Sequence, residues 1–186
     1  MSSIIGGVDY GPLANFIGVW EGRSGVDRAP KPQGDKTTDF SETITYTAVG
    51  DVDNAEVQDL VVVHYHQVVT RIPDGKVYHN QTGYWMWDKG TDEVMFSVSI
   101  PRGLCLLANG TYEKGKAIKF KVKAELGDTA YSVVQSKFLL EKAKTEAFEI
   151  ELTLNENELT YAQTTFLDIY GRKFDHTDTS SLIKKS

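Results

Sequence analysis

Three of the four histidines of the chain fall within one short stretch, residues 59–88. His64 and His66 are separated by one residue, so a β-strand would point both imidazoles to the same face. Two imidazoles at this spacing suit a first-row metal ion such as zinc. Imidazoles can also donate hydrogen bonds to an anionic or carboxylate ligand when charged, or be satisfied by polar neighbours and water. The stretch therefore predicts a polar ligand site or a metal site, and leaves the interpretations open.

The same stretch is predicted to be a β-hairpin around Asp74-Gly75, because an Asp-Gly pair between two β-rich runs is a strong turn signal. With a two-residue turn, His64 would lie opposite Trp85 and share a face with it. In that register His79 is too far from His64 to complete a metal site. The candidates for lining a ligand cavity on or beside this face are His64, His66, His79, Gln81 and Trp85.

Short, regularly spaced strands and no convincing long helix are predicted for the rest of the chain. Consecutive hairpins favour an all-β, up-and-down antiparallel barrel of about ten strands, lipocalin-like or fatty-acid-binding-protein-like, with room for one small ligand. We expect a single β-barrel domain over residues 1–186, with a loose tail over residues 1–10 and a short helical turn near Pro12. The expected strands cover residues 16–26, 39–49, 59–72, 77–88, 93–100, 104–112, 117–126, 133–142, 148–154, 158–169 and 174–184.

The first long strand carries a tryptophan between two glycines. Gly18, Trp20 and Gly22 share one face, which Ser24 and Val26 are expected to continue. Glycine in a strand often marks a sharp bend or the close approach of a ligand or another backbone. Such a tryptophan could stack on a flat ligand or pack in the barrel core, where aromatic side chains dominate burial.

Composition and charge narrow the class of partner. The net charge of −6 and the pI of about 5.2, without clustered Lys and Arg, argue against a nucleic-acid partner. No run approaches the ~20 apolar residues of a membrane span, and the N-terminus lacks the features of a signal peptide. Cys105 is the single cysteine, which excludes an internal disulfide. We expect a cytoplasmic protein with a small-molecule ligand and no hydrolytic motif, and a homodimer is compatible with the sequence.

Four short motifs resemble, in the same order, those of the nitrobindin-type haem-binding β-barrels, also described as fatty-acid-binding-protein-like proteins. They are Gly-x-Trp-x-Gly at 18–22, Gln-Thr-Gly-Tyr-Trp at 81–85, Ile-Pro-Arg-Gly-Leu at 100–104, and a last strand that carries His176 and ends Leu-Ile-Lys-Lys. The resemblance covers about residues 13–185. It implies a ten-stranded barrel and, in some members, haem b whose ferric iron is held by one histidine of the last strand.

The resemblance places the haem-iron ligand on His176, and Asp178 or a backbone carbonyl could accept from the other ring nitrogen and orient the imidazole. A different alignment of the last strand places the ligand position on Asp178 itself. Arg102 would contact a haem propionate or another ligand carboxylate, unless it is solvated or pairs with an acidic neighbour. Trp20 belongs to the same implied haem site. Nitric oxide or peroxynitrite chemistry, of the peroxynitrite isomerase kind, would come with the haem.

The resemblance has departures, and other functions stay open. The family's first strand continues with alternating glycines and a Tyr-Pro, where this chain has Ser24 and Val26 in phase. One alternative is a carrier or sensor of an apolar or carboxylate-bearing molecule without haem, in which His176 is a hydrogen-bonded histidine of a polar cavity. The other is a metal site at the His-x-His of residues 64–66.

Overall fold

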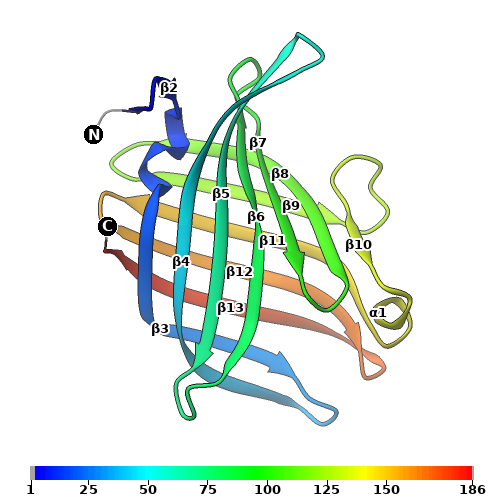
Figure 1. Ribbon diagram of the computed structural model, residues 1–186. Helices are drawn as coiled ribbons and strands as arrows, with labels where there is room; N and C mark the ends of the chain where they lie inside the picture. Colours follow the sequence, from blue (N-terminus) through cyan, green and yellow to red (C-terminus); the bar gives the residue numbers. More distant parts are fainter. Residues whose placement is uncertain (1–2, 186) are drawn as a thin grey trace.

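Ten strands close into a ring in the computed structural model, which describes residues 3–185 (Figure 1). Neighbouring strands are antiparallel and follow chain order around the ring, which closes where the last strand pairs with the first. The up-and-down barrel expected from the sequence is therefore confirmed. The ring strands are β3 (Gly18–Pro30), β4 (Asp35–Asn54), β5 (Gln58–Arg71), β6 (Val77–Asp88), β7 (Val94–Ile100), β8 (Leu104–Lys114), β9 (Ile118–Glu125), β11 (Ala143–Asn155), β12 (Glu158–Ile169) and β13 (Arg172–Lys184).

Alternation of apolar and polar side chains gives each wall strand an inner and an outer face. In β9, Phe120 and Val122 are buried inside the ring, whereas Lys119 and Lys121 are exposed on the outside. Burial of the apolar set removes it from water and stabilises the closed sheet. Among the described residues, no helix is long and apolar enough to cross a membrane.

The N-terminal residues form ordered structure where a loose tail was expected. Strands β1 (Ile4–Ile5) and β2 (Val8–Asp9) pair as a small hairpin, and the 3₁₀ helix η1 (Gly11–Phe16) follows at the predicted helical turn. Phe16 stacks on Trp85 inside one end of the barrel, with ring centroids 5.4 Å apart. This segment therefore closes that end, because it brings buried aromatic surface into the ring. Residues 1–2 of the expected tail lie outside the described part.

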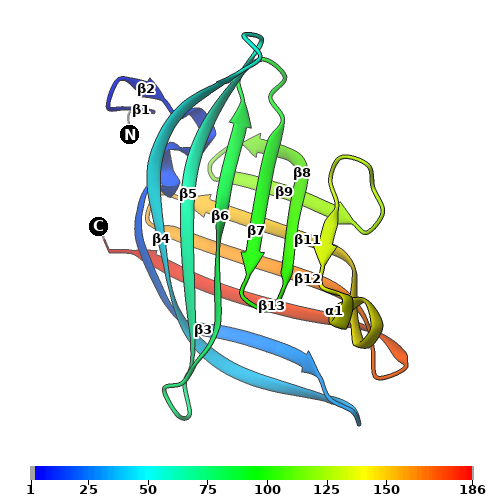
Figure 2. The same ribbon diagram turned by 45° about the vertical axis from the view of Figure 1, so that its right-hand side comes forward.

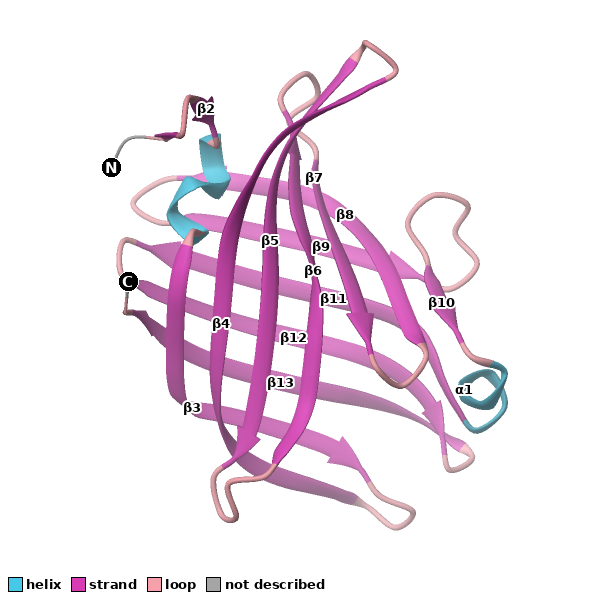
Figure 3. Cartoon of the chain, viewed as in Figure 1, coloured by secondary structure: helices cyan, strands magenta, loops and turns pink. Residues whose placement is uncertain are grey.

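The opposite end of the barrel carries the other short helix. Residues 133–142, expected as one strand, are instead the short strand β10 (Val133–Gln135), which pairs with β8, and the helix α1 (Lys137–Lys142). The Ser136 side chain caps α1 by accepting a hydrogen bond from the Leu139 amide, which favours a helix start there. Figures 2 and 3 show η1 and α1 at opposite ends of strands β11–β13.

The hairpin of β5 and β6 has a different register from the one expected. The turn around Asp74-Gly75 is longer than two residues, and the Arg71 amide donates to the Lys76 carbonyl to close it. A bulge then leaves Tyr78 unpaired between Val77 and His79. The pairing is thereby shifted by one residue from the expected register, and such a shift exchanges the two faces.

Strand β3 also contains a bulge, between Gly22 and Gly25. It reverses the expected alternation, so that Gly25 and Asp27 are buried and Ser24 and Val26 are exposed. A Cβ on Gly25 would overlap the ring of Phe40, so only glycine fits there without movement. The bulge thus directs the carboxylate of Asp27 into the barrel.

Candidate functional site: a polar cavity inside the barrel

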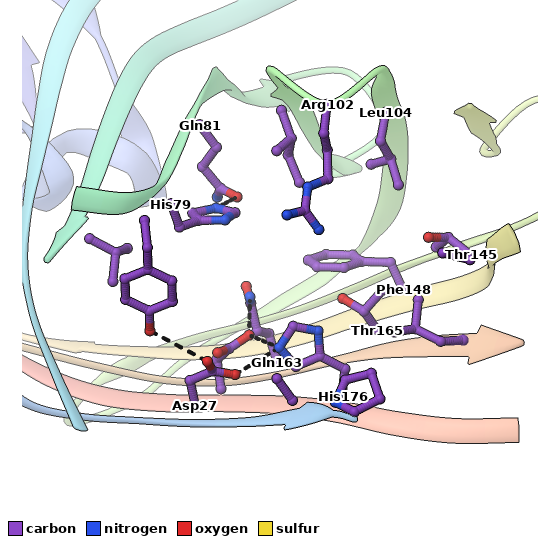
Figure 4. Close-up of a pocket in the computed structure, with 18 of the residues that line it drawn as sticks. Asp27, His79, Gln81, Arg102, Leu104, Thr145, Phe148, Gln163, Thr165 and His176 are labelled. Atoms are coloured by element: carbon purple, nitrogen blue, oxygen red, sulfur yellow. Dashed lines mark hydrogen bonds and ion pairs between the residues drawn. The ribbon is translucent and has the colours of Figure 1, made fainter. Parts of the chain in front are cut away.

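A cavity of about 400 Å³ occupies the end of the barrel near α1. This size lies within the range of small-molecule sites. Five of the residues singled out in the sequence line it, and they come from two opposite walls (Figure 4). They are His79, Gln81, Arg102, His176 and Asp178.

One wall, from β3 and β13, holds a histidine between two carboxylates. Nε2 of His176 lies 2.8 Å from Oδ1 of Asp27 and 3.9 Å from Oδ2 of Asp178. Asp27 is only 6% exposed and also accepts a hydrogen bond of 3.5 Å from the Tyr78 hydroxyl. Gln163 donates its side-chain amide to Oδ2 of Asp178 at 2.9 Å. All the polar groups of this cluster are therefore held in place by one another.

Electrostatics make the protonated form of His176 favourable. Burial alone would lower its pKa, but the hydrogen bond to Asp27 and the negative charges of Asp178 and Asp27 outweigh burial and raise it. The pKa of Asp178 is raised too, chiefly because burial disfavours its charged form. The environment thus disfavours two charged carboxylates with a neutral imidazole, and it favours a proton on His176.

The opposite wall, from β6, is neutral. Nε2 of His79 lies 2.9 Å from Oε1 of Gln81, whose amide donates to the Tyr65 hydroxyl at 3.2 Å. Burial lowers the pKa of His79, so its neutral form is favoured. The two cavity histidines therefore differ in charge preference. Because Oε1 of Gln81 accepts from Nε2, the neutral ring of His79 has its Nδ1 left as an acceptor.

The mouth of the cavity is basic. Arg102 is exposed at the β7–β8 turn, and its guanidinium has no hydrogen bond or ion pair with any residue in the described range 3–185. Figure 4 shows it reaching over the cavity, across from His176. Lys31 and Lys36 also line the cavity and are exposed. An unpaired guanidinium, with two ammonium groups elsewhere on the lining, favours an anionic group in the ligand.

A second buried polar network lies on the inner wall, next to the cavity. The carboxylate of Glu42 accepts hydrogen bonds from the Gln67 amide at 2.5 Å and the Tyr161 hydroxyl at 3.1 Å. Burial raises the pKa of Glu42, and the hydrogen bonds oppose that shift. Gln67 and Tyr161 line the cavity as well, so polar groups extend along its inner wall.

The other residues proposed from the sequence as ligand-binding candidates lie outside the cavity. The expected hairpin face was wrong: His64 and His66 lie on the outside of the barrel, where their Nε2 atoms contact Thr82 at 2.7 Å and Asn80 at 3.0 Å. They do not line the cavity. Trp20 and Trp85 are buried in the packed core near η1, and neither contributes to the cavity wall.

Asp27, which bonds His176, was missed by the sequence reasoning, as were its partner Tyr78 and the Asp178 partner Gln163. In regular alternation Asp27 would point outward, and only the β3 bulge turns it inward. The sequence signal for the bulge is the spacing of Gly22 and Gly25. Three residues apart, they would lie on opposite faces of a regularly alternating strand.

Comparison with known protein families identifies the family to which the chain belongs. Residues 9–184 match the family described as the THAP4-like, heme-binding beta-barrel domain. The chain belongs to that family. The nitrobindin-type resemblance is thereby confirmed, and the barrel is a ligand-binding domain of this kind. The crystal structure of Rv2717c from M. tuberculosis has a similar fold, with a TM-score of 0.70 and 19% identity over 94% of this chain and 95% of that one. No curated protein matches the chain.

The THAP4-like family description raises the question of whether these residues fit haem. Iron ligation by histidine needs a neutral imidazole with a free nitrogen facing the haem. Nε2 of His176 is instead bonded to the buried Asp27, and the raised pKa of His176 favours a proton there. Asp178 carries a carboxylate, which is not among the usual haem ligands. The basic mouth would suit propionates, but as arranged the histidine does not fit iron ligation.

Proposed function

We propose that this barrel binds a small organic molecule with an anionic group, held with its anion at the mouth and its body in the cavity. The observation that carries the proposal is the unpaired guanidinium of Arg102 above a cavity of about 400 Å³. Two more basic side chains, Lys31 and Lys36, line the same cavity, although the net charge of the protein is −6. The apolar part of the ligand would contact Phe148 and Val98, which also line the cavity.

Two fluorescent probes that differ by one charged group test this proposal. The first is 8-anilino-1-naphthalenesulfonate, an anion, and the second is N-phenyl-1-naphthylamine, which lacks the sulfonate. A charge-assisted contact is worth about 1.5–3 kcal/mol, so Arg102→Gln should weaken the anionic probe about tenfold or more. The neutral probe should bind both proteins alike. Arg28→Gln is the matched control, because Arg28 is already paired with Asp35 and is not part of the cavity wall. Equal weakening of both probes, or none, would refute the role of Arg102.

Haem b with nitrogen-oxide chemistry is the second candidate, and the description of the family favours it. It requires His176 to give up its hydrogen bond to Asp27. Hemin added to the purified protein would then produce a sharp Soret band at one haem per chain, and His176→Ala would abolish it. A titration without that band, or one that His176→Ala leaves unchanged, removes His176 as the iron ligand and leaves the anion-binding proposal intact.

A further inference from the structure

Three metal-ligating side chains converge on the cavity wall formed by β3 and β13. Oδ1 of Asp27, Nε2 of His176 and Oδ2 of Asp178 are close, and the cluster's ligand atoms all lie within 4.8 Å of one another. The sheet fixes this arrangement: Asp178 is the cross-strand partner of Asp27, and His176 is two residues before Asp178 on the same face of β13. The donors are therefore held by backbone pairing rather than by a mobile loop.

Burial and neighbouring donors constrain these side chains further. The exposed fractions of the three side chains are 8% for Asp27, 16% for Asp178 and 29% for His176. Gln163 donates to Asp178, and the Tyr78 hydroxyl donates to Asp27. Such outer hydrogen bonds orient carboxylates that bind metals, and they raise affinity by holding the ligand geometry.

The charges of the cluster are unbalanced without a cation. Two carboxylates face one imidazole on this wall, and the opposite wall adds the Tyr78 hydroxyl and the His79 imidazole, both of which are neutral in their favoured forms. Arg102 contributes its charge only from the mouth. A divalent ion that takes the place of the proton between His176 and Asp27 keeps both side chains as partners, whereas haem iron would require His176 to leave Asp27. Such an ion offsets both carboxylates, and buried charges persist when they are paired or coordinate metals.

We propose that Asp27, His176 and Asp178 bind a divalent first-row cation, zinc being the best match to one imidazole and two carboxylates, with an open position toward the cavity. Zinc bonds of about 2.0–2.2 Å in tetrahedral geometry separate ligand atoms by about 3.3–3.6 Å. The separations from Nε2 to the two carboxylate oxygens, 2.8 Å and 3.9 Å, bracket that range. Small side-chain shifts are enough to enclose the ion. This site goes beyond the anion-binding proposal and does not depend on it.

The experiment titrates zinc alone into protein freed of metal by EDTA and then desalted, with a chromophoric chelator as competitor and no organic ligand present. We expect one saturable site per chain, weakened at least about tenfold by Asp178→Asn and by His176→Ala. Cobalt(II) provides a second readout, since its visible absorption reports a tetrahedral site with nitrogen and oxygen ligands. Circular dichroism and thermal unfolding verify that each variant is folded, and Asp178→Asn, which keeps the side-chain shape, covers the case in which His176→Ala does not fold.

The control is the double variant His64→Ala with His66→Ala, which removes the exposed histidine pair on the outer face. It should leave the tight site unchanged. Zinc binding lost in this variant but kept in Asp178→Asn would overturn the proposal and assign the metal to the outer pair. Absence of saturable binding would mean that the three residues form only a proton-held ion pair. Because the probes of the previous section are absent, neither result bears on anion binding.

Discussion

The hydrogen bond between His176 and Asp27 should make the stability of the barrel depend on pH in a defined direction. The folded state raises the pKa of His176 above the ordinary value of 6.5, against the opposing effect of burial. A raised pKa means that the stabilisation is fully present below about pH 6.5 and is lost as the pH rises through the folded-state pKa. Asp27→Asn removes the negative charge but leaves an amide oxygen that can still accept from the ring.

The size of the effect follows from the kind of hydrogen bond that is lost. A bond between charged groups contributes about 1.5–3 kcal/mol and a neutral one about 0.5–1.5 kcal/mol, so the exchange costs about 1 kcal/mol. Both side chains are mostly buried, with exposed fractions of 29% and 8%, and solvent therefore screens the pair little. Asp27→Asn should be less stable than the wild type by about 1 kcal/mol at pH 6, and the difference should shrink toward pH 9.

Urea unfolding at a series of pH values, in the presence of EDTA, measures this difference. The matched control is Asp35→Asn, which breaks an exposed ion pair with Arg28, the neighbour of Asp27 on β3. No group that titrates near neutrality belongs to that pair, so its effect should be flat across the same range. A constant difference for Asp27→Asn, or one that grows with rising pH, would show that Asp27 does not hold the proton on His176.

Three further predictions concern the wall of the barrel. Gly83→Ala would drive a Cβ into the carbonyl oxygen of Ser97, and urea unfolding should show a loss of about 1–3 kcal/mol or more. His64→Ala with His66→Ala should change the free energy of unfolding by less than about 0.5 kcal/mol and leave binding of the anionic probe unaltered, because both rings are on the outer face. Burial raises the pKa of Glu42 in the folded state, so protonated Glu42 favours folding. That stability is lost as the pH rises through the raised pKa. Glu42→Gln should therefore gain stability relative to the wild type as the pH rises above 4.5, the ordinary pKa of glutamate, measured by thermal unfolding.

The barrel could be predicted from the sequence because its strands are marked by independent local signals. Alternation in β9, the turn residues between strands and the absence of a long helical period all indicate the same architecture. The helix α1 was missed because Phe138, Leu139 and Leu140 form an apolar run too short to show a period. Its cap at Ser136 was the more informative local feature.

The register of β5 and β6 could not be predicted from the turn residues alone. Asp74-Gly75 does lie in the turn, but Asp74 also pairs with Arg71 and accepts from the Lys76 amide, which supports a longer loop. The bulge at Tyr78 then changes the register again. Tertiary packing selects this outcome, because it buries Trp85 in the aromatic core and leaves His64 on the outer face. A one-residue difference thus decided which histidines line the cavity.

The chemistry of the cavity depends on the bulge in β3 more than on the barrel itself. A first strand with uninterrupted alternation would point Val26 inward and leave Nε2 of His176 without its closer carboxylate partner. The bulge replaces that apolar side chain with Asp27, and the imidazole becomes a proton carrier or a metal ligand beside two carboxylates. Fold and family therefore specify a barrel with an internal site, whereas the occupant follows from one inserted residue.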